Sequence, residues 1–191
     1  MSSNLYLGLV HHPIYDKRKE VVATAVTNFD IHDIARCAKT FGVGGFFIIT
    51  PLESQIQLTE RIIRHWVEGS GSVYNPTRKE SLSLVRVSRT IEEADREISN
   101  LWKTGVKRVA TGASPHPKNI DFGLFKKLIK DEKTPFFLLF GTGWGLTEEL
   151  KDHSHYVLAP IEGKGYNHLS VRSAVAIILD RLLGDRMNSS E

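Results

Sequence analysis

Apolar and polar residues follow one another along the chain in blocks that predict strands and helices in turn. Leu5–Val10, 45–50 and 136–140 are almost unbroken apolar runs, typical of strands buried on both faces. Between them, apolar residues recur every three or four positions, as in a helix that begins at Asn28 or Asp30 and ends at Phe41. This alternation predicts an α/β fold with a Rossmann-like parallel sheet.

The same reading places the other elements. It predicts strands at 84–87, 106–111 and Tyr156–Leu158, helices at 56–67, Ile91–Trp102 and 120–130, a helix after the 141–145 loop, a last helix ending at Leu183, and polar loops at 11–20, 69–76 and 113–119. We expect a single domain over residues 1–185 and a disordered tail at 186–191.

Glycine-bearing loops follow the last two predicted strands. Gly141, Gly143 and Gly145 come after the 136–140 strand, and Gly163 and Gly165 come after the last strand. Backbone without side chains lets a ligand approach closely, and ligands of parallel α/β sheets bind beyond the carboxyl ends of the strands. We expect the two loops to lie side by side and to form a crevice for a small ligand.

Composition narrows the class of protein only slightly. The 191 residues carry a net charge of +3, which permits an anionic partner such as RNA without requiring one. The single Cys37 excludes an internal disulfide. We see no secretory signal and no apolar run of about 18 residues, so a cytoplasmic protein without a membrane span is expected. The sequence lacks GxGxxG after its first strand, GxxxxGK[ST] and the usual metal-ligand spacings, so no metal is expected.

Three stretches, in order, resemble the motifs of the SPOUT RNA methyltransferases. They are residues 28–43, which contain RCAKTFGV, residues 140–146 (FGTGWGL) and residues 167–177 (NHLSVRSAVAI), with TGAS at 111–114 where the family has a strand-end loop. The nearest match is a small bacterial branch that occurs alone or fused to a tRNA guanine methyltransferase. The resemblance covers nearly the whole chain.

The resemblance implies a fold, a cofactor and an assembly. SPOUT proteins thread the C-terminal part of the sheet into a deep trefoil knot and bind S-adenosylmethionine in its loops. They form homodimers with a shared active site, for which the apolar helix Val171–Leu183 is the expected surface. Carried onto this sequence, the cofactor-binding residues are Thr111, Gly112, Leu139, Phe140, Gly141, Thr142, Gly143, Gly145, Ala159, Pro160, Ile161, Gly163, Tyr166, Leu169 and Ser170.

The resemblance also assigns candidate catalytic residues. Arg36 matches the motif arginine that contacts the acceptor; orienting a phosphate or ribose suits a guanidinium better than acting as a base. Asn28 matches the motif asparagine, at a longer spacing, and His168 stands where the third motif usually has asparagine. Gly143 stands where many ribose methylases carry glutamate. The expected RNA contacts are His11, Lys17, Arg18 and Arg36.

These observations predict an S-adenosylmethionine-dependent RNA methyltransferase that acts on tRNA at a ribose 2′-oxygen. Base methylation of tRNA or rRNA is the alternative within the same class. A non-catalytic nucleotide- or flavin-binding α/β module and an inactive RNA-binding relic of the fold are the alternatives from other classes. Binding of S-adenosylmethionine would distinguish the enzyme from the nucleotide- or flavin-binding module. Transfer of a labelled methyl group to RNA would distinguish it from the inactive relic.

Overall fold

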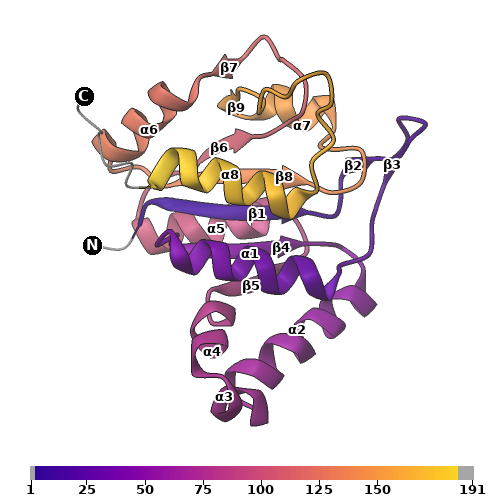
Figure 1. The fold of residues 1–191 in the computed structure, drawn as a ribbon, viewed down its shortest axis with the longest axis vertical. Coiled ribbons are helices and arrows are strands. Elements are labelled where there is room, and N and C mark those ends of the chain that lie inside the picture. The colour runs from indigo at the N-terminus through magenta and orange to yellow at the C-terminus, as the bar shows by residue number, and fades with distance from the viewer. Residues whose placement is uncertain (1–2, 185–191) are drawn as a thin grey trace.

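The computed structural model describes residues 3–184. Seven strands, all paired in parallel, form one sheet in the order β5-β4-β1-β8-β6-β9-β7 (Figure 1). Their bounds are β1 Leu5–Val10, β4 Gly45–Ile49, β5 Val85–Ser88, β6 Lys107–Ala110, β7 Asn119–Ile120, β8 Phe136–Gly141 and β9 Tyr156–Leu158. The parallel α/β fold expected from the sequence is therefore confirmed.

The side chains of β1 show why this strand lies at the centre. Leu5, Leu7 and Leu9 point into one apolar core, and Tyr6 and Val10 point into the core on the other face of the sheet. β4 and β8 flank β1 on its two sides, so the strand is buried along its whole length.

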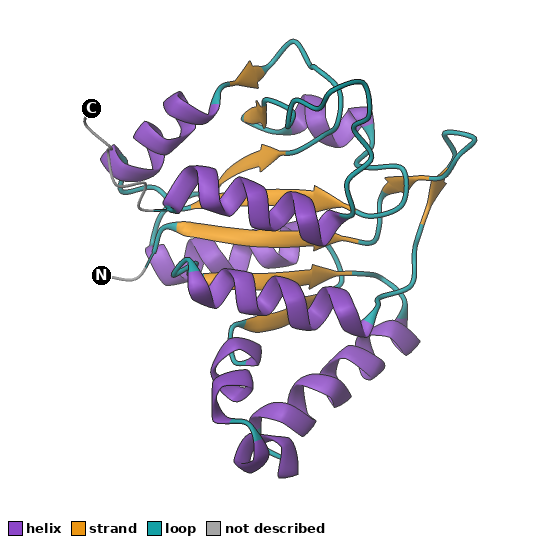
Figure 2. Ribbon diagram, in the orientation of Figure 1, coloured by secondary structure: helices purple, strands orange, loops and turns teal. Residues whose placement is uncertain are grey.

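Helices cover both faces of the sheet (Figure 2). α1 and α8 pack side by side over one face, whereas α5 and α7 supply the core on the other. The helices are α1 Asn28–Thr40, α2 Glu53–Val67, α3 Ser70–Tyr74, α4 Pro76–Leu82, α5 Ile91–Trp102, α6 Phe122–Asp131, α7 Glu148–His153 and α8 Val171–Leu183. Within residues 3–184, no helix is long and apolar enough to cross a membrane.

Two segments predicted as loops contain regular structure. Residues 11–20 hold most of a short hairpin, β2 Ile14–Tyr15 and β3 Val21–Val22, whose turn is fixed by Asp16: its Oδ1 accepts hydrogen bonds from the N–H groups of Arg18 (2.7 Å) and Glu20 (3.0 Å). Residues 69–76 hold α3 and the start of α4. Asn75 caps α4, and Pro76 at its first turn suits a helix start better than a loop.

Element boundaries also differ from the sequence prediction. Thr27, rather than Asn28 or Asp30, caps α1: its side-chain oxygen accepts from the N–H of Asp30 at 3.2 Å. α2 begins earlier than predicted, at Glu53. The predicted 113–119 loop runs into β7, and α6 begins after it with Asp121 as its cap. Polar caps set these boundaries, and the apolar periodicity does not locate them.

The final third of the chain departs from expectation in the order of its strands. β6 lies between β8 and β9, so the two glycine-bearing loops do not follow adjacent strands. One face of α8 is buried: Val175, Leu179 and Leu182 belong to the core cluster between the sheet and the helices that cover it. This buried face belongs to the core of one chain, whereas Ala174, Ala176 and Ile177 of the same helix are only half-buried. That α8 forms the dimer surface stays a prediction. The trefoil knot and the homodimer stay predictions, and the predicted disordered tail lies outside the described residues.

Candidate active site

A cavity of about 990 Å³ opens at the carboxyl edge of the sheet. Its walls come from the β2–β3 hairpin, the start of α1, the 111–114 loop, the turn after β8, the segment after β9 and the first two turns of α8. This is the edge where a parallel sheet presents its ligand. A volume of this size accommodates a small-molecule cofactor.

The turn that follows β8 (residues 141–146) is fixed by its backbone. The N–H of Gly145 donates to the carbonyl of Thr142 at 2.9 Å, and Gly143 and Gly145 adopt positive φ values of 56° and 95°. Tyr15 of the hairpin pairs with the turn in both directions: its N–H donates to Gly145, and its carbonyl accepts from Trp144. The hairpin therefore lies directly on this glycine turn.

Two further contacts join the loops around the cavity. Thr111 donates both its N–H and its hydroxyl to the carbonyl of Leu139, at 3.1 and 2.9 Å. The side-chain amide of Asn167 donates to the carbonyl of Ala113 at 2.9 Å, which ties the segment after β9 to the loop after β6. The loop after β6 is thus hydrogen-bonded both to the end of β8 and to the segment after β9.

The segment after β9 keeps its backbone donors available. Within residues 3–184, none of the N–H groups from 161 to 169 donates a hydrogen bond to the protein. Ile161, Asn167, His168 and Leu169 of this segment line the cavity. A backbone N–H is rarely left unpaired unless it meets solvent or a ligand, so this wall can bind a polar group.

A chain of hydrogen bonds lies beneath the cavity and fixes the state of His11. The hydroxyl of Thr142 donates to the carbonyl of Val10 at 3.1 Å, so in its 2.6 Å contact with Thr24 it must accept. The hydroxyl of Thr24 therefore donates its only proton to Thr142. In its 3.0 Å contact with Nδ1 of His11 it can then only accept. His11 therefore carries its proton on Nδ1.

Burial keeps this imidazole neutral. The desolvation of His11 lowers its pKa to about 4, against a smaller opposing effect of the Asp30 carboxylate. Its side chain has no exposed surface, and its Nε2 has no partner among the described residues. The prediction that His11 contacts RNA does not fit this position, and the residue supports the cavity from within.

The structure brings together most of the predicted cofactor residues but not all of them. Those that line the cavity are Thr111, Gly112, Phe140, Gly141, Thr142, Gly143, Gly145, Ala159, Ile161, Leu169 and Ser170. Those that do not are Leu139, Pro160, Gly163 and Tyr166. The side chain of Leu139 packs in the core on the α5 side of the sheet. A Cβ on Gly163 would lie 2.3 Å from the carbonyl oxygen of Tyr166, so this glycine is needed for a tight bend.

The three predicted catalytic residues lie apart. His168 lines the cavity, where its ring meets that of Tyr166 at a centroid distance of 5.4 Å. Asn28 is exposed at the start of α1 and does not line it. Arg36 lies two turns further along α1 and lines a second cavity, between α1 and α4. Within one chain, therefore, only His168 is at the candidate cofactor cavity.

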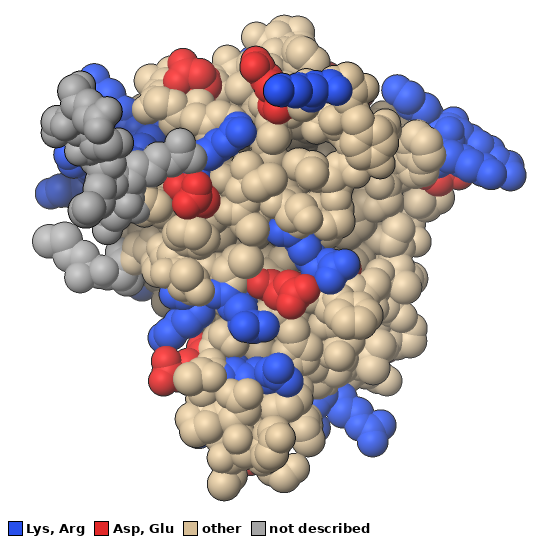
Figure 3. All heavy atoms as spheres, viewed as in Figure 1, with Lys and Arg blue, Asp and Glu red and all other residues tan. Residues whose placement is uncertain are grey.

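The predicted RNA-binding lysine and arginine lie at the tip of the hairpin. Lys17, Arg18 and Lys19 are exposed, and basic side chains project there in Figure 3. Lys17 and Lys19 also line the cavity, whereas Arg18 is not part of its lining. Their position suits contact with an anionic ligand that extends out of the cavity.

Asp30, which the sequence indicates only as a possible helix cap, lies at the candidate site. Its carboxylate lines the cavity and is 8% exposed. It accepts from the hydroxyl of Thr27 at 2.6 Å and pairs with Nε of Arg172 at 3.3 Å. Arg172 also pairs with Asp33, so it joins the start of α8 to α1. Trp144 was overlooked too: it lines the cavity with 66% of its surface exposed. No cluster of three potential metal ligands occurs in the described part of the chain.

Comparisons with known proteins agree with this architecture. Residues 4–184 match the sequence profile of a family described as SAM-dependent RNA methyltransferase. A protein of Oleidesulfovibrio alaskensis named tRNA (guanine-N(1)-)-methyltransferase is 42% identical over 96% of this chain, but the match covers 43% of that protein. The chain therefore spans less than half the length of this relative. An uncharacterised protein of Aquifex aeolicus is 36% identical over 95% of this chain and 89% of its own length.

A solved structure shows the same fold. The SpoU methyltransferase AviRb of Streptomyces viridochromogenes, in complex with AdoMet, aligns with a TM-score of 0.56 over 96% of this chain and 58% of its own, at 18% identity. A likeness at this identity supports the fold, and the family match over nearly the full length supports the class. The protein belongs to the family of S-adenosylmethionine-dependent RNA methyltransferases and has the SPOUT-type fold.

Proposed function

We propose that the 990 Å³ cavity binds S-adenosylmethionine and that the chain transfers its methyl group to tRNA. The observation that carries the proposal is that Ile161, Asn167, His168 and Leu169, whose backbone N–H groups make no hydrogen bond within residues 3–184, line the same cavity as the glycine turn. An adenine ring needs an apolar slot with backbone donors and acceptors, and Phe140, Ile161 and Leu169 provide apolar walls beside such groups.

Two charged side chains of the lining are available to the polar part of the cofactor. Asp30 offers a carboxylate to an ammonium group, and Lys151, although paired with Glu148 at 2.8 Å, offers a cation to a carboxylate. When bound, the cofactor supplies an electrophilic methyl group. The protein must then align the acceptor atom of the RNA with that methyl group and take up the proton that the acceptor atom loses.

His168 is the predicted catalytic residue that this geometry favours for the proton. It lines the cavity, is exposed, and carries a ring nitrogen of the kind that serves as a general base in enzymes. Arg36 and Asn28 lie on α1 outside the cavity, which favours a contact with RNA away from the methyl group. In the homodimer that the family resemblance implies, a second chain could add its own residues to the cavity mouth.

The substrate side of the site lies at the cavity mouth. The cations of the hairpin tip can contact phosphates, and Trp144 and Tyr166, 66% and 72% exposed, can stack on an unstacked base. The name of the Oleidesulfovibrio relative supports tRNA as the substrate.

Two acceptor atoms have support from different observations. The motif that contains Arg36 favours a ribose 2′-oxygen, as in the ribose methylases that the sequence resembles. The name of the same relative favours N1 of guanine, a base position, but this chain covers less than half of that protein. The named activity can therefore belong to the part of the relative that this chain does not match.

One experiment tests the proposal and separates the acceptors. The protein is incubated with methyl-labelled S-adenosylmethionine and unmodified total tRNA, and the labelled nucleoside is identified by mass spectrometry after complete digestion. A 2′-O-methylated nucleoside would support the ribose 2′-oxygen as the acceptor. 1-Methylguanosine would support N1 of guanine. Cofactor binding without any labelled RNA would remove the catalytic proposal.

A further inference from the structure

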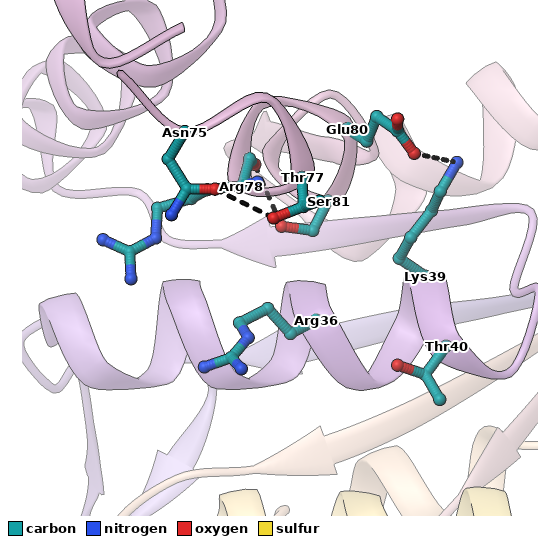
Figure 4. Close-up of a pocket in the computed structure, with 8 residues that line it drawn as sticks. All are labelled: Arg36, Lys39, Thr40, Asn75, Thr77, Arg78, Glu80 and Ser81. Carbon is teal, nitrogen blue, oxygen red and sulfur yellow. Dashed lines mark hydrogen bonds and ion pairs between the residues drawn. The ribbon is translucent and has the colours of Figure 1, made fainter. Parts of the chain in front are cut away.

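A second cavity, of about 320 Å³, lies between α1 and α4 and is separate from the candidate cofactor cavity. Figure 4 shows its lining, which consists of Arg36, Lys39 and Thr40 from α1 and Asn75, Thr77, Arg78, Glu80 and Ser81 from α4 and its cap. We call it the α1–α4 groove. The three motif stretches at 28–43, 140–146 and 167–177 do not contain the residues that α4 contributes.

The charges in this groove are unbalanced. Lys39 and Glu80 form an exposed ion pair, with 3.5 Å between Nζ and Oε2. Within residues 3–184, neither Arg36 nor Arg78 has a carboxylate within ion-pair distance. In Figure 4 the two guanidinium groups extend toward the same end of the groove, away from the Lys39–Glu80 pair. Two uncompensated like charges repel each other unless an anion lies between or beside them.

Arg78 is held in place. Its guanidinium carbon lies 4.5 Å from the ring centroid of Trp66 on α2, and that ring meets His32 of α1 edge-on at 5.6 Å. The N–H of Arg78 donates to the side chain of Asn75 at 3.0 Å. Stacking on an aromatic face orients a guanidinium and leaves its N–H groups free to donate, which reduces the entropy lost when it binds an anion.

The acidic side chains near the two arginines have other cationic partners: Glu80 pairs with Lys39, and Asp33 pairs with Arg172 on α8 at 3.0 Å. Burial lowers the pKa of His32, and the charges of Arg78 and Arg36 lower it further against the opposing effect of Asp33. The two arginines thus present a cationic pair beside a neutral imidazole.

We propose that the α1–α4 groove binds a phosphodiester group of the RNA substrate, with Arg36 and Arg78 donating to one phosphate from the two helices. Planar guanidinium groups match phosphate oxygens in two-point contacts, and hydroxyl groups of Thr77 and Ser81 in the lining can add neutral donors. The source of the phosphate, RNA, rests on the proposed function; the phosphate chemistry rests on the groove alone. The groove would hold RNA at a distance from the reacting nucleotide.

The test is RNA binding without catalysis. An end-labelled, unmodified tRNA transcript is titrated with the protein in the absence of S-adenosylmethionine, and fluorescence anisotropy is followed at several KCl concentrations. Arg78→Ala should weaken binding about tenfold and reduce the slope of log K against log salt by about 0.7–0.9, as expected for one lost phosphate contact. Arg78→Gln, which keeps much of the packing on Trp66, should behave in the same way.

Lys79→Ala is the matched control. It removes the same charge from the next residue of α4, which is exposed and does not line the groove. If Arg78→Ala and Lys79→Ala weaken RNA binding equally, or if the wild-type protein binds no RNA, the proposal is wrong. Because binding is measured without the cofactor, a groove that binds RNA in a protein that transfers no methyl group would contradict only the proposed function.

A double-mutant cycle tests whether the two arginines share one phosphate. If they do, the double variant Arg36→Ala/Arg78→Ala should raise the dissociation constant for tRNA by less than the product of the two single increases. The reason is that either single change already disrupts the shared contact. Effects that multiply fully would show that the two side chains act independently and would overturn the shared contact. Thermal unfolding followed by circular dichroism confirms that each variant is folded.

Discussion

The hydroxyl oxygens of Thr24 and Thr142 lie 2.6 Å apart, and their contact joins the segment after the hairpin to the glycine turn. Thr142 donates in turn to the carbonyl of Val10, so the direction of every proton in the chain from His11 onward is determined. The contact lies in the lining of the cavity that we assign to the cofactor.

Replacing Thr142 by valine should destabilise this junction. The hydroxyl of Thr24 would lose its acceptor, and an unsatisfied polar group in a poorly solvated position costs about 1–3 kcal/mol. We expect a loss of that size in the free energy of unfolding, measured by urea denaturation. Thr142→Ser keeps the hydroxyl and serves as the control; an equal loss in both variants would mean that packing of the methyl group, and not the hydrogen bond, matters.

His11 makes stability depend on pH in a defined window. Its pKa is about 4 in the folded protein and about 6.5 when unfolded, so the unfolded state takes up a proton first as the pH falls. Its contribution is fully present above pH 6.5 and is lost as the pH falls toward 4, by about 3 kcal/mol in total. Urea unfolding at pH 7.5 and 5 should show about 2 kcal/mol of this loss, and His11→Asn should show a much smaller one. An unchanged drop in His11→Asn would assign the effect to other groups.

Gly143→Val should disrupt the cofactor site by displacing the β2–β3 hairpin from the glycine turn. Gly143 has a φ of 56°, which a β-branched residue adopts at a cost, and a Cβ there would lie 2.8 Å from Cδ1 of Ile14. The hairpin must then separate from the turn. We expect the dissociation constant for S-adenosylhomocysteine to rise at least about tenfold.

Gly105→Ala is the control for that change. Gly105 lies outside the cavity, and an added Cβ meets nothing within 4 Å. Calorimetry should give wild-type affinity for this variant. Wild-type affinity in Gly143→Val as well would contradict the role of the glycine turn.

Trp144 should contribute to RNA binding and not to stability. Its backbone is pinned to Tyr15, whereas its indole is 66% exposed at the cavity. Base stacking on an aromatic side chain is worth about 1–3 kcal/mol, so Trp144→Ala should weaken tRNA binding between about 5- and 150-fold, and Trp144→Phe much less. Equal binding by all three proteins, measured by anisotropy, would exclude a stacking role.

Arg36→Ala should separate cofactor binding from transfer. Arg36 lies outside the candidate cofactor cavity, so affinity for S-adenosylhomocysteine should be unchanged. Methyl transfer at sub-saturating tRNA should fall about tenfold, the scale expected for one lost phosphate contact. Lys126→Ala, at an exposed position on α6, is the charge-matched control. Turnover of Arg36→Ala at the wild-type rate would contradict the role that the motif assigns to this arginine.

The sequence predicted the sheet and most of the cavity because both follow from local patterns. The unbroken apolar strand at 136–140 and the glycines after it are readable without any tertiary information, and so is the TGAS loop at Thr111. Loops at the carboxyl ends of parallel strands converge by topology, which is why so many of the predicted cofactor residues share one cavity.

The rest depended on contacts between distant parts of the chain. Nothing in the polar stretch around Asp16 indicates that it folds onto a turn more than 100 residues later, and only the structure shows that His11 is buried there. The groove between Arg36 and Arg78 is formed in part by α4. The sequence predicts a loop up to Pro76 and no helix after it, so the groove could not be predicted. Charge pairing across helices leaves no periodic signal in the sequence.

Calorimetric titration of the wild-type protein with S-adenosylhomocysteine tests the central assignment most directly. The account predicts binding in the micromolar range with one site per chain, no comparable binding of ATP or flavin mononucleotide, and loss of the heat signal in Gly143→Val but not in Gly105→Ala. A folded wild-type protein that gives no heat with S-adenosylhomocysteine or S-adenosylmethionine would contradict the assignment of the cavity.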